Sequence, residues 1–217
     1  MTKERKIALI IGILGFAAII IQMYFSVSRN LENGKTIVYA LNHYFSYFTI
    51  LTNTALAVLL LSVAIVPSRK ISKWFGKASV SSAFLVYILV VGIVYYVLLL
   101  NVWKPTGLEF VANHILHGAV PCGYAIFWFK FRRSGALKFS QTWAWLWYPG
   151  LYFIYLMIRG AILGVYPYFF VDVARFGLLT VLLYSCGILA FFKFLAYLLV
   201  RFDRAVKSFD TEVTGKE

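Results

Sequence analysis

Apolar segments of about 20 residues recur along almost the whole chain, and this pattern constrains the fold more than any other feature. Of 217 residues, 62% are hydrophobic, and the mean hydropathy is +0.81. Soluble domains contain about 45–50% apolar residues, so the composition predicts an integral membrane protein. A membrane-spanning helix needs about 20 apolar residues. Six segments meet this requirement: 7–26, 44–66, 83–101, 110–131, 143–165 and 176–200.

The expected architecture is all-α, a single six-transmembrane-helix bundle that comprises residues 1–217. The formal net charge of +13 could suggest a nucleic-acid partner, but the basic residues cluster before the first span and after every second span. The clusters are Lys3, Arg5 and Lys6; Arg69, Lys70, Lys73 and Lys77; Lys130, Arg132, Arg133 and Lys138; and Arg201, Arg204 and Lys207. This is the positive-inside pattern, so we expect both termini, including a frayed tail at 201–217, in the cytoplasm and no nucleic-acid partner.

Two cysteines lie near the middle of predicted spans. Cys122 belongs to the fourth segment and Cys186 to the sixth. Because both positions are far from an oxidising aqueous compartment, we expect free, buried thiols.

The fourth apolar segment contains an unusual group of polar residues, Asn113, His114 and His117. At about 100° per residue, Asn113 and His117 share one helix face, and His114 lies at its flank. Hydrocarbon penalises polar groups, so such side chains usually face the bundle interior and indicate a site. The alternative is that they only hydrogen-bond to neighbouring helices.

Polar residues on three predicted spans lie at a similar depth. With a rise of 1.5 Å per residue, Thr49 lies roughly 8 Å below the outer surface, His117 roughly 10 Å and Arg159 roughly 9 Å. Asn53 lies on the Thr49 face of the second span, and Tyr155 lies on the Arg159 face of the fifth. Two alternatives remain open, namely that the hydroxyl groups only join helices, and that Arg159 forms an ion pair with Asp172 or Glu109.

The motifs that are absent and the polar residues that are present limit the types of reaction that this chain could catalyse. The sequence contains no Gly-x-Ser-x-Gly, HExxH, phosphate-loop or Cys-x-x-Cys motif, and we expect neither a metal nor a cofactor. A threonine hydroxyl becomes a nucleophile when a neutral histidine takes its proton, as Thr49 and His117 could do. Asn53, Asn113 or a tyrosine hydroxyl could stabilise an oxyanion. Arg159 could hold a substrate carboxylate.

Two short motifs carry a family resemblance. The segment from Phe45 to Leu51, Phe-Ser-Tyr-Phe-Thr-Ile-Leu, and the Asn-His-Ile-Leu-His segment from Asn113 to His117 resemble the androgen-induced-gene family of six-span membrane proteins. The stretch 164–169 resembles the family's Tyr-Pro turn. The resemblance implies hydrolysis of fatty acid esters of hydroxy fatty acids, with Thr49 as nucleophile and His117 as base. It also implies a bacterial-like member, located in the cytoplasmic membrane.

The chain departs from the animal members at two positions. Gly118 follows His117 where they have threonine, and Arg159 lies where they tend to carry histidines. Fold therefore transfers more safely than substrate.

The sequence thus predicts a lipid-ester hydrolase whose substrate enters from the outer leaflet into a pocket between the second, fourth and fifth spans. Thr49 and His117 are the predicted catalytic residues. The predicted substrate-binding residues are Asn53, Asn113, His114, Tyr155 and Arg159. The expected partners are membrane lipids and a lipid ester, and the oligomeric state is not predicted. The alternative is a non-catalytic lipid- or solute-binding protein or small transporter that uses the same polar residues. A third reading is haem ligation by His114 or His117.

Overall fold

The chain is almost entirely helical. The computed structural model describes the backbone of residues 1–102 and 104–214, and side chains as far as residue 206. Within these residues every regular element is a helix, which confirms the all-α prediction. The chain divides into two compact units, Met1–Arg133 and Ser134–Glu217, and each is described below by itself.

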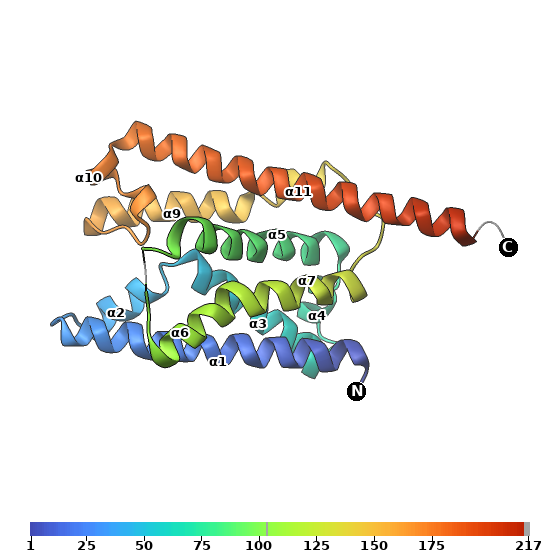
Figure 1. The fold of residues 1–217 in the computed structure, drawn as a ribbon, viewed down its shortest axis with the longest axis horizontal. Coiled ribbons are helices and arrows are strands. Elements are labelled where there is room, and N and C mark those ends of the chain that lie inside the picture. Colours follow the sequence, from blue (N-terminus) through green and yellow to red (C-terminus); the bar gives the residue numbers. More distant parts are fainter. Residues whose placement is uncertain (103, 215–217) are drawn as a thin grey trace. The chain divides into compact units, whose positions relative to one another are not determined.

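The first unit contains four long helical stretches (Figure 1). Its elements are α1 (Lys3–Glu32), α2 (Ile37–Tyr44), α3 (Phe48–Ile65), α4 (Lys70–Phe75), α5 (Ala78–Val94), η1 (Tyr95–Leu99), α6 (Gly107–His114), η2 (Ile115–Ala119) and α7 (Val120–Phe131). The elements of the second unit are α8 (Gln141–Ala144), α9 (Trp147–Leu163), η3 (Phe169–Val171), α10 (Val173–Phe176) and α11 (Leu178–Thr214).

Five helices of the described chain are long and apolar enough to cross a membrane. They are Lys3–Glu32, Phe48–Ile65, Ala78–Leu99, Gln141–Leu163 and Leu178–Val206. These helices support an integral membrane protein. The helical stretch 107–131 is not among the five. Asn113, His114 and His117 lower its hydropathy, and the same residues form the candidate site described below.

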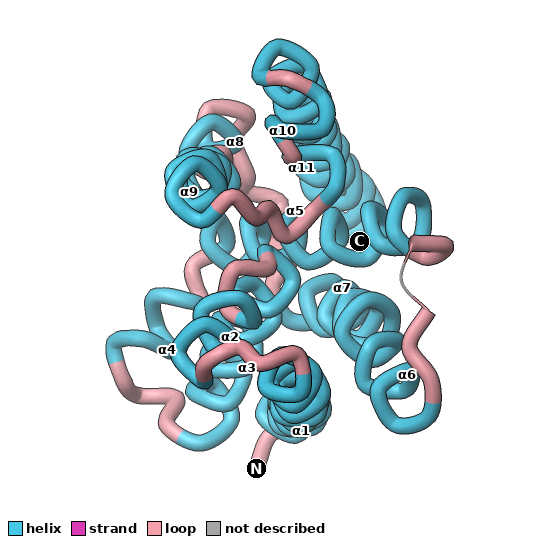
Figure 2. The backbone as a smooth tube through the Cα atoms, turned by 90° about the vertical axis from the view of Figure 1, so that its left-hand side faces the viewer, coloured by secondary structure: helices cyan, strands magenta, loops and turns pink. Residues whose placement is uncertain are grey.

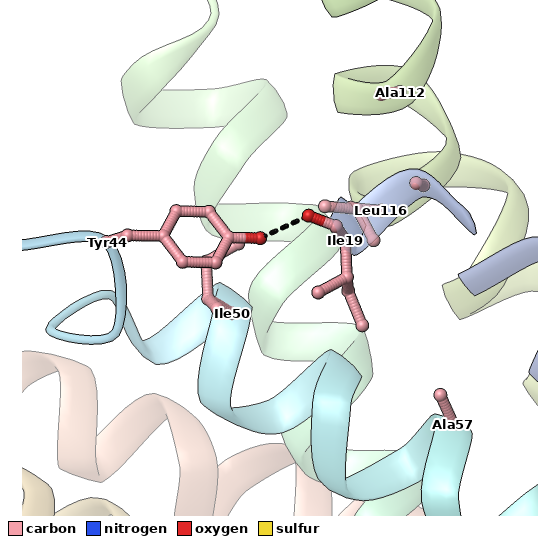
Figure 3. Close-up of a cluster of buried hydrophobic side chains, with 7 residues drawn as sticks. Ile19, Tyr44, Ile50, Ala57, Ala112 and Leu116 are labelled. Atoms are coloured by element: carbon pink, nitrogen blue, oxygen red, sulfur yellow. Dashed lines mark hydrogen bonds between the residues drawn. The ribbon is translucent and has the colours of Figure 1, made fainter. Parts of the chain in front are cut away.

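The helices of the first unit close into a ring. α1 packs against α3 and α7, α3 packs against α5, and α5 packs against α7. Figure 2 shows these helices nearly end-on. Between them lies an apolar cluster that includes Ile19 of α1, Ile50 of α3 and Leu116 of η2 (Figure 3). Tyr44 packs into this cluster. Its hydroxyl, the only polar atom of the side chain, donates a hydrogen bond to the main-chain carbonyl of Ile19. Since Ile50 and Leu116 are sequence neighbours of Thr49 and His117, this packing helps to hold α3 against η2.

The second predicted span begins four residues later than expected. Tyr44 ends the short helix α2, and α3 begins at Phe48. The intervening turn is stabilised by Ser46, whose hydroxyl donates to the carbonyl of His43 at 2.6 Å. Serine side chains compete with the helix for main-chain groups in this way, and apolarity alone does not reveal the interruption.

Two π-helical turns interrupt the long helices of the first unit. In η1 the amide of Leu100 donates to the carbonyl of Tyr95, five residues earlier, at 2.8 Å. In η2 the amide of Val120 donates to the carbonyl of Ile115. Such turns insert one residue per turn, change the direction of the side chains, and occur frequently at functional sites.

The last helix of the second unit extends beyond the predicted span. We expected the span to end at residue 200 and the tail to fray, but α11 continues to Thr214. Asp203 on this extension is fully buried. Its carboxylate accepts hydrogen bonds from the amides of Ser134, Gly135 and Leu137, at 3.0, 2.9 and 3.2 Å. Residues beyond the apolar segment therefore anchor the loop that precedes α8.

The two thiols differ in part from the prediction. Cys122 and Cys186 are free, as expected, but both are exposed on the surface of the chain rather than buried. In a membrane protein, mid-span residues on the outer surface of the helices contact lipid, so depth in the bilayer does not imply burial in protein.

Candidate active site

Thr49 and His117 lie within hydrogen-bonding distance of each other in the first unit. Thr49 belongs to the first turn of α3, and His117 lies in the middle of η2. The Thr49 Oγ1 atom is 3.3 Å from the His117 Nε2 atom. Each residue is only 9% exposed. The two residues are 68 positions apart in the sequence, and it is the packing of α3 against η2 that brings them together.

The other ring nitrogen of His117 determines what Nε2 can do. The Nδ1 atom lies 2.8 Å from the main-chain oxygen of Asn113. A carbonyl oxygen only accepts hydrogen bonds, so Nδ1 carries the proton in the neutral ring. Nε2 is then an acceptor, and the hydroxyl of Thr49 donates to it. This is the tautomer that a general base requires.

Tyr95 covers one face of the imidazole. Its ring centroid lies 4.0 Å from that of His117, and the two ring planes make an angle of 24°. The Tyr95 hydroxyl accepts a hydrogen bond from the side-chain amide of Asn113. Asn113 therefore orients both rings, the imidazole through its main-chain oxygen and the phenol through its side chain. Asn113 is buried, at 4% exposure, which fits a positioning role.

Asn53 joins α3 to η2 one helical turn after Thr49. Its Nδ2 atom donates to the main-chain oxygen of Thr49 at 2.9 Å and to that of Leu116 at 3.3 Å. Both amide hydrogens are thus engaged, and the side chain is not positioned to donate to an oxyanion. Its Oδ1 atom is buried without a hydrogen-bond partner. Asn53 therefore fixes the positions of the residues beside it.

Two glycines allow the close approach of these elements. A Cβ atom at Gly92 of α5 would lie 2.8 Å from the main-chain oxygen of His117, and a Cβ atom at Gly118 would lie 2.8 Å from the hydroxyl of Tyr96. Distances under 3.0 Å require a shift of one partner. Gly118 thus lies directly against the ring and hydroxyl of Tyr96.

His114 lies beside the pair rather than in it. Its Nδ1 atom is 3.0 Å from the carbonyl oxygen of Phe110, and its ring packs against the ring of Phe110 at 4.0 Å. Edge contacts to Tyr95 and Tyr96 complete an aromatic cluster around it. The structure brings His114 near the site without a polar contact to Thr49 or His117.

Tyr155 and Arg159 belong to α9 of the second unit. Tyr155 is 39% exposed and packs against Tyr152. Arg159 is buried, and its Nη1 atom donates to the carbonyl of Val165 at 2.9 Å. The two carboxylates considered as ion-pair partners for Arg159 both make other contacts in the structure. Glu109 pairs with Arg29 at 2.8 Å, and Asp172 accepts from the first amides of α10.

Sequence reasoning missed Tyr95. Polar residues of similar depth were sought on the second, fourth and fifth spans but not on the third. The third predicted span ends at residue 101, so Tyr95 lies roughly 9 Å from its outer end, close to the depth of Thr49 and His117. That depth was the available signal. The stacking on His117 was not predictable, because it depends on the π-helical turns that rotate both side chains.

The arrangement has the elements of a hydroxyl nucleophile with a histidine base. Both nitrogens of His117 are engaged, Nδ1 by the Asn113 carbonyl and Nε2 by the Thr49 hydroxyl. Among the described residues no group of three or more His, Cys, Asp or Glu side chains gathers as a metal site would require.

Comparisons with family models, with curated proteins and with solved structures found no match to this chain. Functional assignment therefore rests on the residues and the geometry described above.

Proposed function

We propose that this chain is a six-span membrane hydrolase of lipid esters in which Thr49 is the nucleophile and His117 is the general base. The single observation that carries the proposal is the contact of 3.3 Å between Thr49 Oγ1 and His117 Nε2, with the opposite nitrogen held by the Asn113 carbonyl. A nucleophile, a base and a group that orients the base are the parts that covalent acyl transfer needs.

The proposed reaction has two stages. The Thr49 oxygen attacks the ester carbonyl while its proton passes to Nε2 of His117. The tetrahedral intermediate then expels the alcohol, which takes that proton, and an acyl-threonine remains. In the second stage water attacks the acyl group and passes a proton to His117. The tetrahedral intermediate then expels the Thr49 oxygen, which takes that proton from His117, and the fatty acid is released. The amide hydrogens of Asn53 are already engaged, so oxyanion stabilisation falls to other donors.

The proposal includes the sixth span and its orientation. The stretch 107–131 crosses the membrane as the fourth span, and its polar residues face the interior of the first unit, where Asn113 and His117 are buried. With basic clusters on the inner side, both termini lie in the cytoplasm and the site lies in the outer half of the membrane. The resemblance to the androgen-induced-gene family supports fatty acid esters of hydroxy fatty acids as the first substrates to test.

Labelling by a fluorophosphonate tests the nucleophile directly, since the probe forms a covalent bond with an activated hydroxyl. Purified wild type, Thr49→Ala, Thr49→Ser and His117→Ala would be treated in detergent, and the labelled residue located by mass spectrometry. We expect labelling of wild type on Thr49, retention in Thr49→Ser and loss in the two alanine variants. Thr142, whose hydroxyl donates to the carbonyl of Phe139, provides a matched control, and Thr142→Ala is expected to leave labelling intact.

A panel of lipid esters would then identify the substrate class. Retained hydrolysis in Thr49→Ala would remove the nucleophile assignment. A folded wild type that reacts with neither the probe nor any ester would favour the alternative, a non-catalytic lipid- or solute-binding protein or transporter.

A further inference from the structure

Tyr95 lies flat against the base of the proposed site, and this contact has a consequence for the chemistry. The rings of Tyr95 and His117 are stacked at 4.0 Å, and Tyr95 is only 3% exposed. In serine hydrolases a carboxylate stabilises the imidazolium that forms when histidine takes the proton. Here the group at Nδ1 is the neutral carbonyl of Asn113.

We propose that the aromatic face of Tyr95 stabilises the His117 imidazolium during attack by Thr49, in the role that a carboxylate has elsewhere. The inference rests on the proposed function and deepens it. A cation within about 6 Å of the centroid of a tyrosine ring is attracted by the negative face of the ring, and the attraction is larger where water is excluded. Both rings are buried and their separation is well within that limit.

The surroundings of Tyr95 hold this face in place. The Asn113 amide donates to the Tyr95 hydroxyl, and Tyr96 packs edge-on against the ring at 5.1 Å. The main-chain oxygen of Asn113 also accepts from Nδ1 of His117, so Asn113 fixes the Tyr95 ring and the His117 imidazole relative to each other. Tyr95 is therefore a positioning and electrostatic residue that acts through His117, and it does not itself exchange a proton with the substrate in this role.

Fluorination of the ring separates electrostatics from packing. Each fluorine withdraws charge from the aromatic face and changes the size of the ring little. The test replaces Tyr95 first by Phe and then by mono-, di- and trifluorinated phenylalanine, incorporated into the full-length protein. The reference is Tyr95→Phe, so that loss of the hydroxyl is common to the whole series. The readout is the maximal rate of fluorophosphonate labelling and, separately, the probe concentration that gives half of that rate.

We expect the maximal rate to fall stepwise with each fluorine, by roughly tenfold or more across the series, while the half-saturating concentration stays constant. Tyr95→Leu, which has no aromatic face, should be at least as slow as the trifluorinated variant. The matched control is the same series at Tyr124, a fully buried tyrosine that stacks on Phe75 and Phe127 and donates to the Ser81 carbonyl. In that series we expect the maximal labelling rate to be the same for every variant.

The outcomes distinguish the inference from the function on which it rests. If wild type labels on Thr49 but the maximal labelling rate does not change with fluorination at position 95, the role of Tyr95 is overturned and the nucleophile assignment stands. A parallel decline at positions 95 and 124 also overturns it, because it would report a general effect on the fold. A folded wild type that does not label overturns the hydrolase proposal and this inference together.

Discussion

Gly92 of α5 lies directly against the main-chain oxygen of His117, and a Cβ atom at this position would come within 2.8 Å of it. Gly92→Ala should therefore push η2 away from α5 and disturb the Thr49–His117 contact, with a stability cost of about 1–3 kcal/mol. Thermal unfolding in detergent and the rate of fluorophosphonate labelling measure the two effects. Gly15→Ala is the control, because a Cβ there meets Val120 and Ala57 at 3.5 and 3.8 Å, which is ordinary contact. Equal behaviour of the two variants would contradict the prediction.

Thr49 and His117 should behave as one functional unit. Removing a general base lowers a rate by about 10²–10⁴-fold, so His117→Ala should slow ester hydrolysis by a factor in that range. The double variant with Thr49→Ala should be no slower than the slower single variant, because residues that act in the same step are not additive. Steady-state kinetics on the ester that wild type hydrolyses fastest provide the measurement. Multiplicative effects of the two substitutions would show that the residues act independently.

Asn53 should matter for the fold of the site more than for chemistry. Asn53→Leu removes the side-chain donor to the buried carbonyls of Thr49 and Leu116, at a cost of about 1–3 kcal/mol. Thermal unfolding should report this loss. Asn33→Ala is the exposed comparison, since its amide donates to the carbonyl of Arg29 at the surface, and it should change the midpoint little. An unchanged midpoint for Asn53→Leu would refute the bridging role.

The ion pair of Arg29 and Glu109 should couple the end of α1 to the start of α6. One guanidinium nitrogen contacts both carboxylate oxygens, at 2.9 and 2.8 Å, and Gln22 donates to the Glu109 carbonyl at 3.1 Å. A double-mutant cycle with Arg29→Ala and Glu109→Gln is expected to give a coupling free energy of about 0.5–3 kcal/mol. The Arg29 side chain is 43% exposed, so the value should lie toward the lower end and fall at high salt. A coupling of zero would mean that the contact does not stabilise the first unit.

Asp203 should hold the loop before α8 through three main-chain amides. Asp203→Ala leaves the amides of Ser134, Gly135 and Leu137 without this acceptor and should expose the loop to proteolysis. Asp203→Asn keeps one acceptor oxygen and should be intermediate. Limited proteolysis with identification of the cleavage site distinguishes the three proteins. Cleavage at equal rates in all of them would show that the carboxylate does not restrain the loop.

The sequence was sufficient for some features of this protein and not for others. Apolar length predicted the all-α architecture and six spans, and five of these correspond to helices of the described chain that are long and apolar enough to cross a membrane. The rise per residue also placed Thr49 and His117 at similar depth. Both arguments depend on local, periodic properties that can be counted along the chain.

Other features depended on specific hydrogen bonds, some local and some between distant segments. The turn at Ser46 that delays α3, and the continuation of α11 to Thr214, both contradict boundaries drawn from apolarity. Asp203 lies beyond the apolar segment, and its partners lie more than 60 residues earlier. A hydropathy pattern contains no information about such hydrogen bonds, because they form only when the helices pack.

In the candidate site, too, some features followed from the sequence and others only from the tertiary structure. Residue types and depth determined that a hydroxyl and an imidazole lie in the same layer of the protein. The tertiary structure decided that Nδ1 of His117 faces the Asn113 carbonyl, that Nε2 faces Thr49, and that Tyr95 covers the ring. The physical reason is that π-helical turns in η1 and η2 and the close approach at Gly92 set the rotation of each side chain, and these arise from packing between helices rather than from the sequence of any one of them.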